Sequence, residues 1–156
     1  MNCYDIPMRL LLQRVSRASV CVDSKVVASI GRGYLLFLAV MEGDSEQDAD
    51  WLARKVAALR LFEGDGGRVN DRSLLDIGGA ALVVSQFTLA GSIEKGNRPD
   101  YTRASAPERA GKLYTYFAEQ LRLAGIADVQ LGQFGAMMQV SLVNDGPVTL
   151  WLPRGV

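Results

Sequence analysis

Residues 8–40 read MRLLLQRVSRASVCVDSKVVASIGRGYLLFLAV, and this stretch decides the fold class. It is rich in Val, Leu and Ile, and polar residues alternate with them at the period of a β-strand. The turn-forming triplets DSK and GRG divide its later part. We therefore predict four short strands, over residues 8–16, 18–23, 25–30 and 33–40.

The next segment, SEQDADWLARKVAALRLF at 45–62, has the spacing of an amphipathic helix. Asp44 or Ser45 can serve as its N-cap, and acidic residues crowd its first turn, as the helix dipole prefers. Its apolar face is expected to consist of Ala49, Leu52, Val56 and Leu59.

A second helix is predicted from residue 105 to residue 124. Ser105 and Glu108 have the spacing of a capping box, with an early proline between them, and Gly125 ends the pattern. Its apolar stripe is expected to be Ala110, Leu113, Tyr114, Phe117, Leu121 and Ala124.

The remaining segments complete a β-rich, α, β, α, β-rich order. GGAALVVSQF at 78–87 is predicted to be a buried strand, and MMQVSLVN and PVTLWL are predicted to be two closing strands joined through NDG. No repeat or linker divides the chain. We therefore predict an α+β protein with a mixed or antiparallel sheet and two main helices, as a single domain over residues 8–156 after an extension at residues 1–7.

Composition narrows the possible functions. The 156 residues include 17 Lys and Arg and 17 Asp and Glu, so the formal net charge is zero. This balance argues against a protein that coats nucleic acid non-specifically. No apolar run reaches the roughly 18 residues of a membrane span, and no signal peptide is recognisable. With two cysteines and no histidine, we expect free thiols in a reducing cytoplasm and neither metal nor cofactor.

The stretch SQFTL at 85–89 is the first candidate site. Ser85 and Thr88 resemble nucleophiles at the end of a strand, yet the chain has no histidine to activate them. Lys95 is the nearest lysine in sequence, and a structural role for both hydroxyls is a simpler interpretation. A third interpretation is that backbone N–H groups left unpaired where the strand ends form an oxyanion hole, which needs no titratable side chain.

Two further stretches are candidate recognition elements. In NDGPVT, Gly146 and Pro147 form either a plain β-turn or a rigid peptide, able to be cis, that presents backbone carbonyls. In EKGNRPDY, Lys95, Arg98 and Tyr101 suit contact with phosphate and a stacked RNA base, although a solvated loop fits the same residues.

Taken together, SQFTL and NDGPVT resemble the two signature motifs of the D-aminoacyl-tRNA deacylase family, in its bacterial and eukaryotic form. The resemblance extends over nearly the whole chain from Met8. Its flanking matches are LLQRVSRASV at 11–20, GxRPxY at 96–101, SAPERAxxLYxYF at 105–117 and MQVSLVNDGPVTLWL at 138–152.

This resemblance implies a barrel-like fold and hydrolysis of the ester between a D-amino acid, or mischarged glycine, and the 3′ end of tRNA. It implies a homodimer in which Gly146 and Pro147, in cis, enter the partner's pocket and exclude L-amino acids. Phe87 and Thr88 would supply backbone amides at the scissile carbonyl, and the 2′-OH of the tRNA would assist. The resemblance further assigns Ser85 and Gln86 to the pocket, Asn144 and Met138 to the substrate filter, Arg14 to holding the Gly-Pro loop, and Lys95, Arg98 and Tyr101 to tRNA binding.

One position departs from the family pattern. Met137 stands where many relatives are expected to have an acidic residue. Two rival functions also fit the sequence: an esterase of small esters with Thr88 as nucleophile, and a dimeric protein that binds RNA ends without catalysis.

Overall fold

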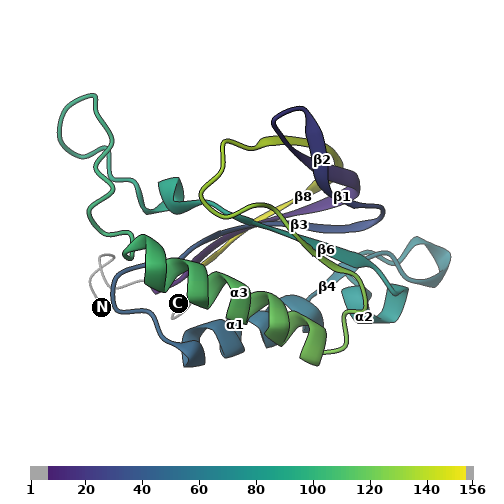
Figure 1. Cartoon of the computed structure of the whole chain (residues 1–156). Helices are drawn as coiled ribbons and strands as arrows, with labels where there is room; N and C mark the ends of the chain where they lie inside the picture. The colour runs from purple at the N-terminus through teal and green to yellow at the C-terminus, as the bar shows by residue number, and fades with distance from the viewer. Residues whose placement is uncertain (1–6, 154–156) are drawn as a thin grey trace.

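The computed structural model describes residues 7–153 and is built around a six-stranded sheet (Figure 1). Its strands are β1 (Arg9–Val22), β2 (Lys25–Ile30), β3 (Gly33–Ala39), β6 (Ala80–Ser85), β7 (Val129–Leu131) and β8 (Gln139–Pro153). They follow the order β2-β1-β3-β6-β7, and β8 pairs with the other edge of β1. Pairing is antiparallel around β1 and parallel for β3–β6 and β6–β7. The mixed sheet curls into a nearly closed, barrel-like form in which β2 comes near β6 and β7.

Helices cover one face of this sheet. They are α1 (Glu46–Ala58), α2 (Leu74–Ile77) and α3 (Pro107–Leu123), and two short 3-10 turns are η1 (Asp65–Gly67) and η2 (Phe87–Ala90). Figure 1 shows α1 and α3 side by side along this face, while the β1–β2 hairpin rises over the other. The α+β class and the two main helices are confirmed. None of the helices within residues 7–153 is long and apolar enough to cross a membrane.

The first predicted helix is shorter than expected. Ser45, one of the two predicted candidates, is the N-cap of this helix. The N–H and the hydroxyl of Ser45 both donate to the Asp48 carboxylate at 2.7 Å. The helix ends at Ala58, because Leu59 takes an extended conformation. The chain then enters β4 (Arg60–Phe62), which pairs with β5 (Arg72–Ser73) in a separate two-stranded sheet.

Ser105 does not cap the second helix, so the predicted capping box is wrong. Ala106 is the N-cap and Pro107 is the first helical residue. Proline fits there because its missing N–H would have no partner in the first turn. The Ser105 hydroxyl is instead buried without a hydrogen-bond partner among the described residues. The predicted apolar stripe of this helix does face the core.

The predicted strands at 8–16 and 18–23 are one continuous strand, β1. Val15 pairs with Asn144 and Arg17 with Val143, so Ser16 is an extra residue, a β-bulge. Because side chains alternate across a strand, one extra residue exchanges the two faces. Leu10 and Leu12 therefore face the helices, whereas Ala18 and Val20 face the opposite side of the sheet.

This exchange divides the interior into two cores. The larger lies between the sheet and helices α1 and α3. The smaller is made by strand residues alone, inside the curl of the sheet, and includes Val15, Val20, Leu82 and Val84. The bulge at Ser16 shifts the alternation of polar and apolar residues by one position. For this reason the sequence of residues 8–23 looks like two strands although it forms one.

The two predicted closing strands are likewise one strand, β8, and NDG is not a turn between them. Asn144 pairs with Val15 and Thr149 with Gln13, so residues 145–148 bulge from the strand opposite Arg14 alone. The Gly146–Pro147 peptide within this bulge is cis, as the resemblance implied.

Tyr114 ties α3 to the end of β6, and its replacement gives a prediction about stability. Its buried hydroxyl donates to Val83 O at 2.8 Å. Tyr114→Phe should lower the free energy of unfolding by about 1 kcal/mol, which corresponds to a Tm lower by about 2–4 °C in a chain of this size. Thermal unfolding measures this, with Tyr101→Phe on the surface as the control. An unchanged Tm for Tyr114→Phe would contradict the prediction.

Candidate active site

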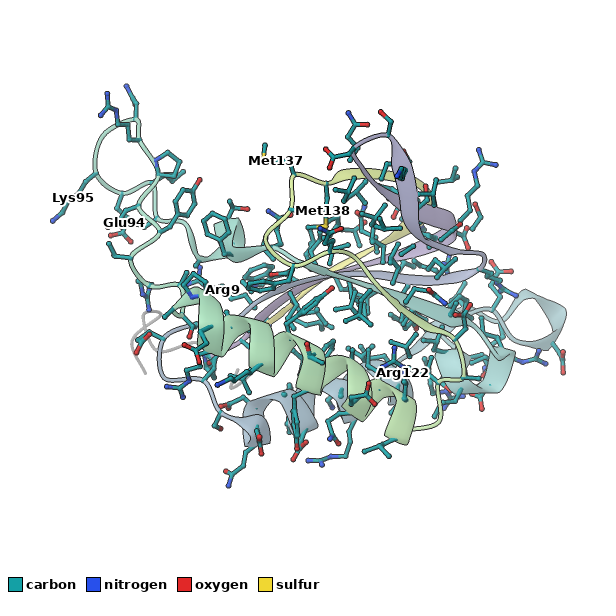
Figure 2. All side chains as sticks on the ribbon, viewed as in Figure 1. Arg9, Glu94, Lys95, Arg122, Met137 and Met138 are labelled. Carbon is teal, nitrogen blue, oxygen red and sulfur yellow. The ribbon has the colours of Figure 1, made fainter. Side chains whose placement is uncertain are left out.

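A cleft of about 1090 Å³ opens where β6 ends. Its walls come from the end of β6 and η2, the start of α3, the β1–β2 hairpin, and the segment 134–140 that leads into β8. Figure 2 shows Met137 and Met138 of that segment on the same side of the sheet as the β1–β2 hairpin. No lysine or arginine is among the described residues that line the cleft, and Asp23 is their single carboxylate.

The predicted pocket residues Ser85, Gln86, Phe87 and Thr88 all line this cleft, together with Met138. These residues reach the cleft because they follow β6, which pairs in parallel with β3. The pairing extends one residue past β6, where the Gln86 N–H donates to Leu38 O at 2.8 Å. The Gln86 side-chain amide donates to the Thr88 hydroxyl oxygen. The hydroxyl of Thr88 therefore bonds to the Gln86 amide, and no lysine among the described lining residues could act as its base.

The turn η2 leaves two backbone donors unused. Leu89 N–H donates to Gln86 O at 3.2 Å, and Gly91 N–H donates to Thr88 O at 3.0 Å. Within residues 7–153, the N–H groups of Phe87 and Thr88 make no such bond to protein. Unpaired amides at the mouth of a cleft are ready donors for an oxygen that develops negative charge.

Arg9 holds the far end of this turn. Its guanidinium donates to Leu89 O at 2.7 Å, and burial, with the nearby charge of Arg103, lowers its pKa. A charged donor on the Leu89 carbonyl stabilises η2 where the chain leaves the cleft.

An aromatic pair stands at the rim of the cleft. The rings of Phe87 and Tyr101 meet edge to face, with centroids 5.3 Å apart, and Phe87 is 56% exposed. Glycine at position 91 makes the pair possible, because an added Cβ would lie 2.9 Å from a Tyr101 ring carbon. The rim therefore offers exposed aromatic surface beside the unpaired amides.

The other predicted tRNA-binding residues lie apart from the cleft. Lys95 and Arg98 are exposed on the loop that Ser92 and Asp100 close through a β-bridge. Figure 2 shows Lys95 on this projecting loop, well separated from Met138. Of the predicted set, Tyr101 alone lines the cleft.

The Gly-Pro bulge also lies outside the cleft of its own chain. Arg14, which is only 8% exposed, holds this bulge. Its Nε donates to Asp145 O at 3.2 Å, and its Nη2 donates to Gly146 O at 3.4 Å. An ion pair also joins Arg14 Nε to Asp145 Oδ2 at 3.1 Å. Asn144 closes the base of the bulge, where its Oδ1 accepts from Gln13 and Thr149 at 3.3 Å. The predicted site residues thus lie in three separate places: the cleft, the projecting loop and the Gly-Pro bulge.

Sequence reasoning found Met138 and noted Met137 but missed the rest of the cleft wall that they belong to. Phe134 and Ala110 line the cleft, and Met137 is 93% exposed at its edge. The glycines of LGQFGAMM marked a loop there but gave no sign that it turns back over β6. Asp145, the ion-pair partner of Arg14, was also missed. The predicted extension at residues 1–7 falls almost entirely outside the described residues.

Comparisons with known proteins identify the family of this chain. The family model described as D-Tyr-tRNA(Tyr) deacylase matches residues 11–153. The chain is 57% identical to a D-aminoacyl-tRNA deacylase of Thermomicrobium roseum, over 93% of each chain. It is 56% identical to one of Roseiflexus castenholzii, over 96% of this chain and 94% of the other.

Two solved structures share the fold. The c-Myc DNA Unwinding Element Binding Protein superposes with a TM-score of 0.89 at 39% identity, over 95% of this chain and 99% of the other. A probable eukaryotic D-amino acid tRNA deacylase superposes with a TM-score of 0.81 at 19% identity, over 95% and 100%. At that lower identity the likeness concerns the fold alone.

The fold and the relatives define the class first: a single-domain α+β hydrolase that acts on ester bonds. Within that class, the chain belongs to the D-Tyr-tRNA(Tyr) deacylase family.

Proposed function

We propose that this protein hydrolyses the ester of D-aminoacyl-tRNA, and of mischarged glycyl-tRNA, as a cytoplasmic homodimer that needs no cofactor. The observation that carries the proposal is the pair of unpaired N–H groups at Phe87 and Thr88 in a cleft that holds no lysine or arginine among its described residues. This arrangement favours stabilisation of an oxyanion over attack by a side chain.

The chemistry follows from the substrate as much as from the cleft. When water attacks the ester carbonyl, its oxygen becomes negative and accepts hydrogen bonds from the two amides. The 2′-OH of the terminal adenosine, next to the ester, orients or activates that water in place of a protein base. Ser85, Gln86 and Met138 shape the pocket around the aminoacyl group.

Stereochemical selectivity is assigned to the Gly-Pro bulge of a second subunit. In this chain Gly146 and Pro147 are exposed, outside the cleft and held by Arg14 and Asn144, which leaves their outer surface available to a partner. A rigid pair of carbonyls in the partner's cleft would collide with the side chain of an L-amino acid, whereas a D-amino acid directs its side chain elsewhere. Selection by rejection also accounts for glycine, which has no side chain to exclude.

The tRNA is proposed to meet the rim and the projecting loop. Tyr101 offers a ring to a terminal base, and Lys95 and Arg98 offer charge to phosphates further along the acceptor end. Such contacts should weaken as salt concentration rises.

One experiment separates this proposal from its rivals. The purified protein is incubated with D-Tyr-tRNA and, separately, with a p-nitrophenyl acyl ester, and both tyrosine release and tRNA binding are measured. The proposal expects turnover of D-Tyr-tRNA and negligible turnover of the small ester. Efficient turnover of the ester would indicate the Thr88-nucleophile esterase, and binding of tRNA without release would indicate an RNA-end binder.

Gly146→Ala tests the filter without disturbing the fold. An added Cβ would meet only the Asn144 side-chain amide, at an ordinary 3.6 Å, so Tm should change by less than about 2 °C. In the partner's cleft the extra methyl group would crowd even a D-substrate, and overpacking of 1–3 kcal/mol should slow deacylation about tenfold or more.

Gly31→Ala is the matched control for that variant, because its added Cβ would meet nothing within 4 Å. Its deacylation rate should equal that of the wild type. If Gly146→Ala also kept the wild-type rate, the Gly-Pro bulge would have no part in the reaction.

A further inference from the structure

The Arg14 guanidinium joins two parts of the chain that are distant in sequence. On one side it donates to the carbonyls of Asp145 and Gly146, at 3.2 and 3.4 Å. On the other side its Nη1 donates to Leu61 O in β4. The group is almost wholly buried, so its position depends on these neighbours and not on solvent.

The neighbour on the β4 side is an aromatic ring. Phe62 is fully buried, and the Arg14 guanidinium carbon lies over it, 5.9 Å from its centroid. The Arg32 guanidinium lies over the same ring at 5.0 Å, and Tyr34 stacks on it at 5.2 Å with an interplanar angle of 16°. The position of the Phe62 ring therefore does not depend on Arg14, because Arg32 and Tyr34 also hold it.

The contacts to the Gly-Pro bulge do not determine the orientation of Arg14 by themselves. Hydrogen bonds of 3.2 and 3.4 Å lie at and beyond the upper end of the usual N–H···O range, and the Asp145 side chain in the ion pair is 44% exposed. A buried guanidinium also gains from the face of an aromatic ring. The ring of Phe62 and the adjacent carbonyl of Leu61 thus define where the bulge is held.

We propose that Phe62 is a positioning residue for stereochemical selectivity, acting through Arg14 on the carbonyls of Gly146 and Pro147. The inference rests on the proposed function, since it assumes that this bulge rejects L-amino acids. It assigns a part in substrate choice to β4, an element that contributes nothing to the described cleft. Replacement of the ring should let the guanidinium and the bulge shift, and a displaced bulge would collide less with an L-side chain.

The test compares two variants with the same chemical change. Phe62→Leu removes the ring beside Arg14, and Phe117→Leu removes an equally buried ring from α3 in the same core, so both should lose similar stability. Initial rates on D-Tyr-tRNA and L-Tyr-tRNA give the D-to-L rate ratio. We expect this ratio to fall about tenfold in Phe62→Leu, the effect of a partly relieved clash, and to stay at the wild-type value in Phe117→Leu. Phe62→Met, which has about the same volume as leucine but a more flexible side chain that fills gaps better, replaces the leucine variant if that variant does not fold.

A second readout does not depend on activity. In protein labelled with ¹⁵N-arginine, the Arg14 Nε–H should exchange slowly with water in the wild type and in Phe117→Leu, and about tenfold faster in Phe62→Leu, because its hydrogen bond to Asp145 opens more often. Unchanged exchange and an unchanged ratio in Phe62→Leu would overturn the inference. Faster exchange in a protein that shows no preference for D-Tyr-tRNA would instead refute the proposed function and, with it, the role in selectivity.

Discussion

Thr88→Pro is expected to lower kcat on D-Tyr-tRNA about 10²- to 10³-fold, the effect of removing one oxyanion donor. Thr88→Ala should retain most of the activity. Both variants lack the hydroxyl, and the proline variant lacks in addition the backbone N–H of residue 88. Single-turnover deacylation measures both rates without a contribution from product release.

The structure permits this comparison. The Thr88 N–H has no protein acceptor among the described residues, so proline removes no intramolecular hydrogen bond. The first turn of a helix is also where proline is tolerated. Matching Tm values for the two variants would show that η2 survives. A loss of about 10⁴-fold in Thr88→Ala, the scale of a missing nucleophile, would contradict the role assigned to the backbone.

A D-aminoacyl-tRNA whose terminal adenosine lacks the 2′-OH should be cleaved at least about 10²-fold more slowly, the lower range for loss of general acid–base catalysis. The reason is the absence of a protein base: the chain has no histidine, and no lysine is among the described residues that line the cleft. The modified tRNA should still bind, so its Kd serves as the control. Equal rates for the two substrates would exclude assistance by the RNA.

The elements with a regular pattern were predictable from the sequence. Residues 25–30 and 33–39 are strands as expected, and the apolar stripes of both main helices face the core, because period and burial agree there. The errors in the strands concern bulges, while those in the helices concern where each helix begins or ends. Ser16 and residues 145–148 add residues within strands β1 and β8, and no local pattern distinguishes a bulge from a turn between two strands.

Several residues that line the candidate cleft were predictable from the sequence, but the arrangement of the cleft was not. SQFTL stands at the end of a buried strand, and the cleft opens there. Its opposite wall depends on the path of the segment 134–138, and the contact of Arg14 with Phe62 depends on where β4 packs. These are long-range relations, set by tertiary packing and not by spacing along the chain.

The most direct test of the central claim is deacylation of D-Tyr-tRNA and L-Tyr-tRNA by the wild-type protein under the same conditions. The clash of an L-side chain with a rigid carbonyl, at about 1–3 kcal/mol, predicts that the D-form is cleaved about 5- to 150-fold faster. Equal rates, or faster release from L-Tyr-tRNA, would contradict the account.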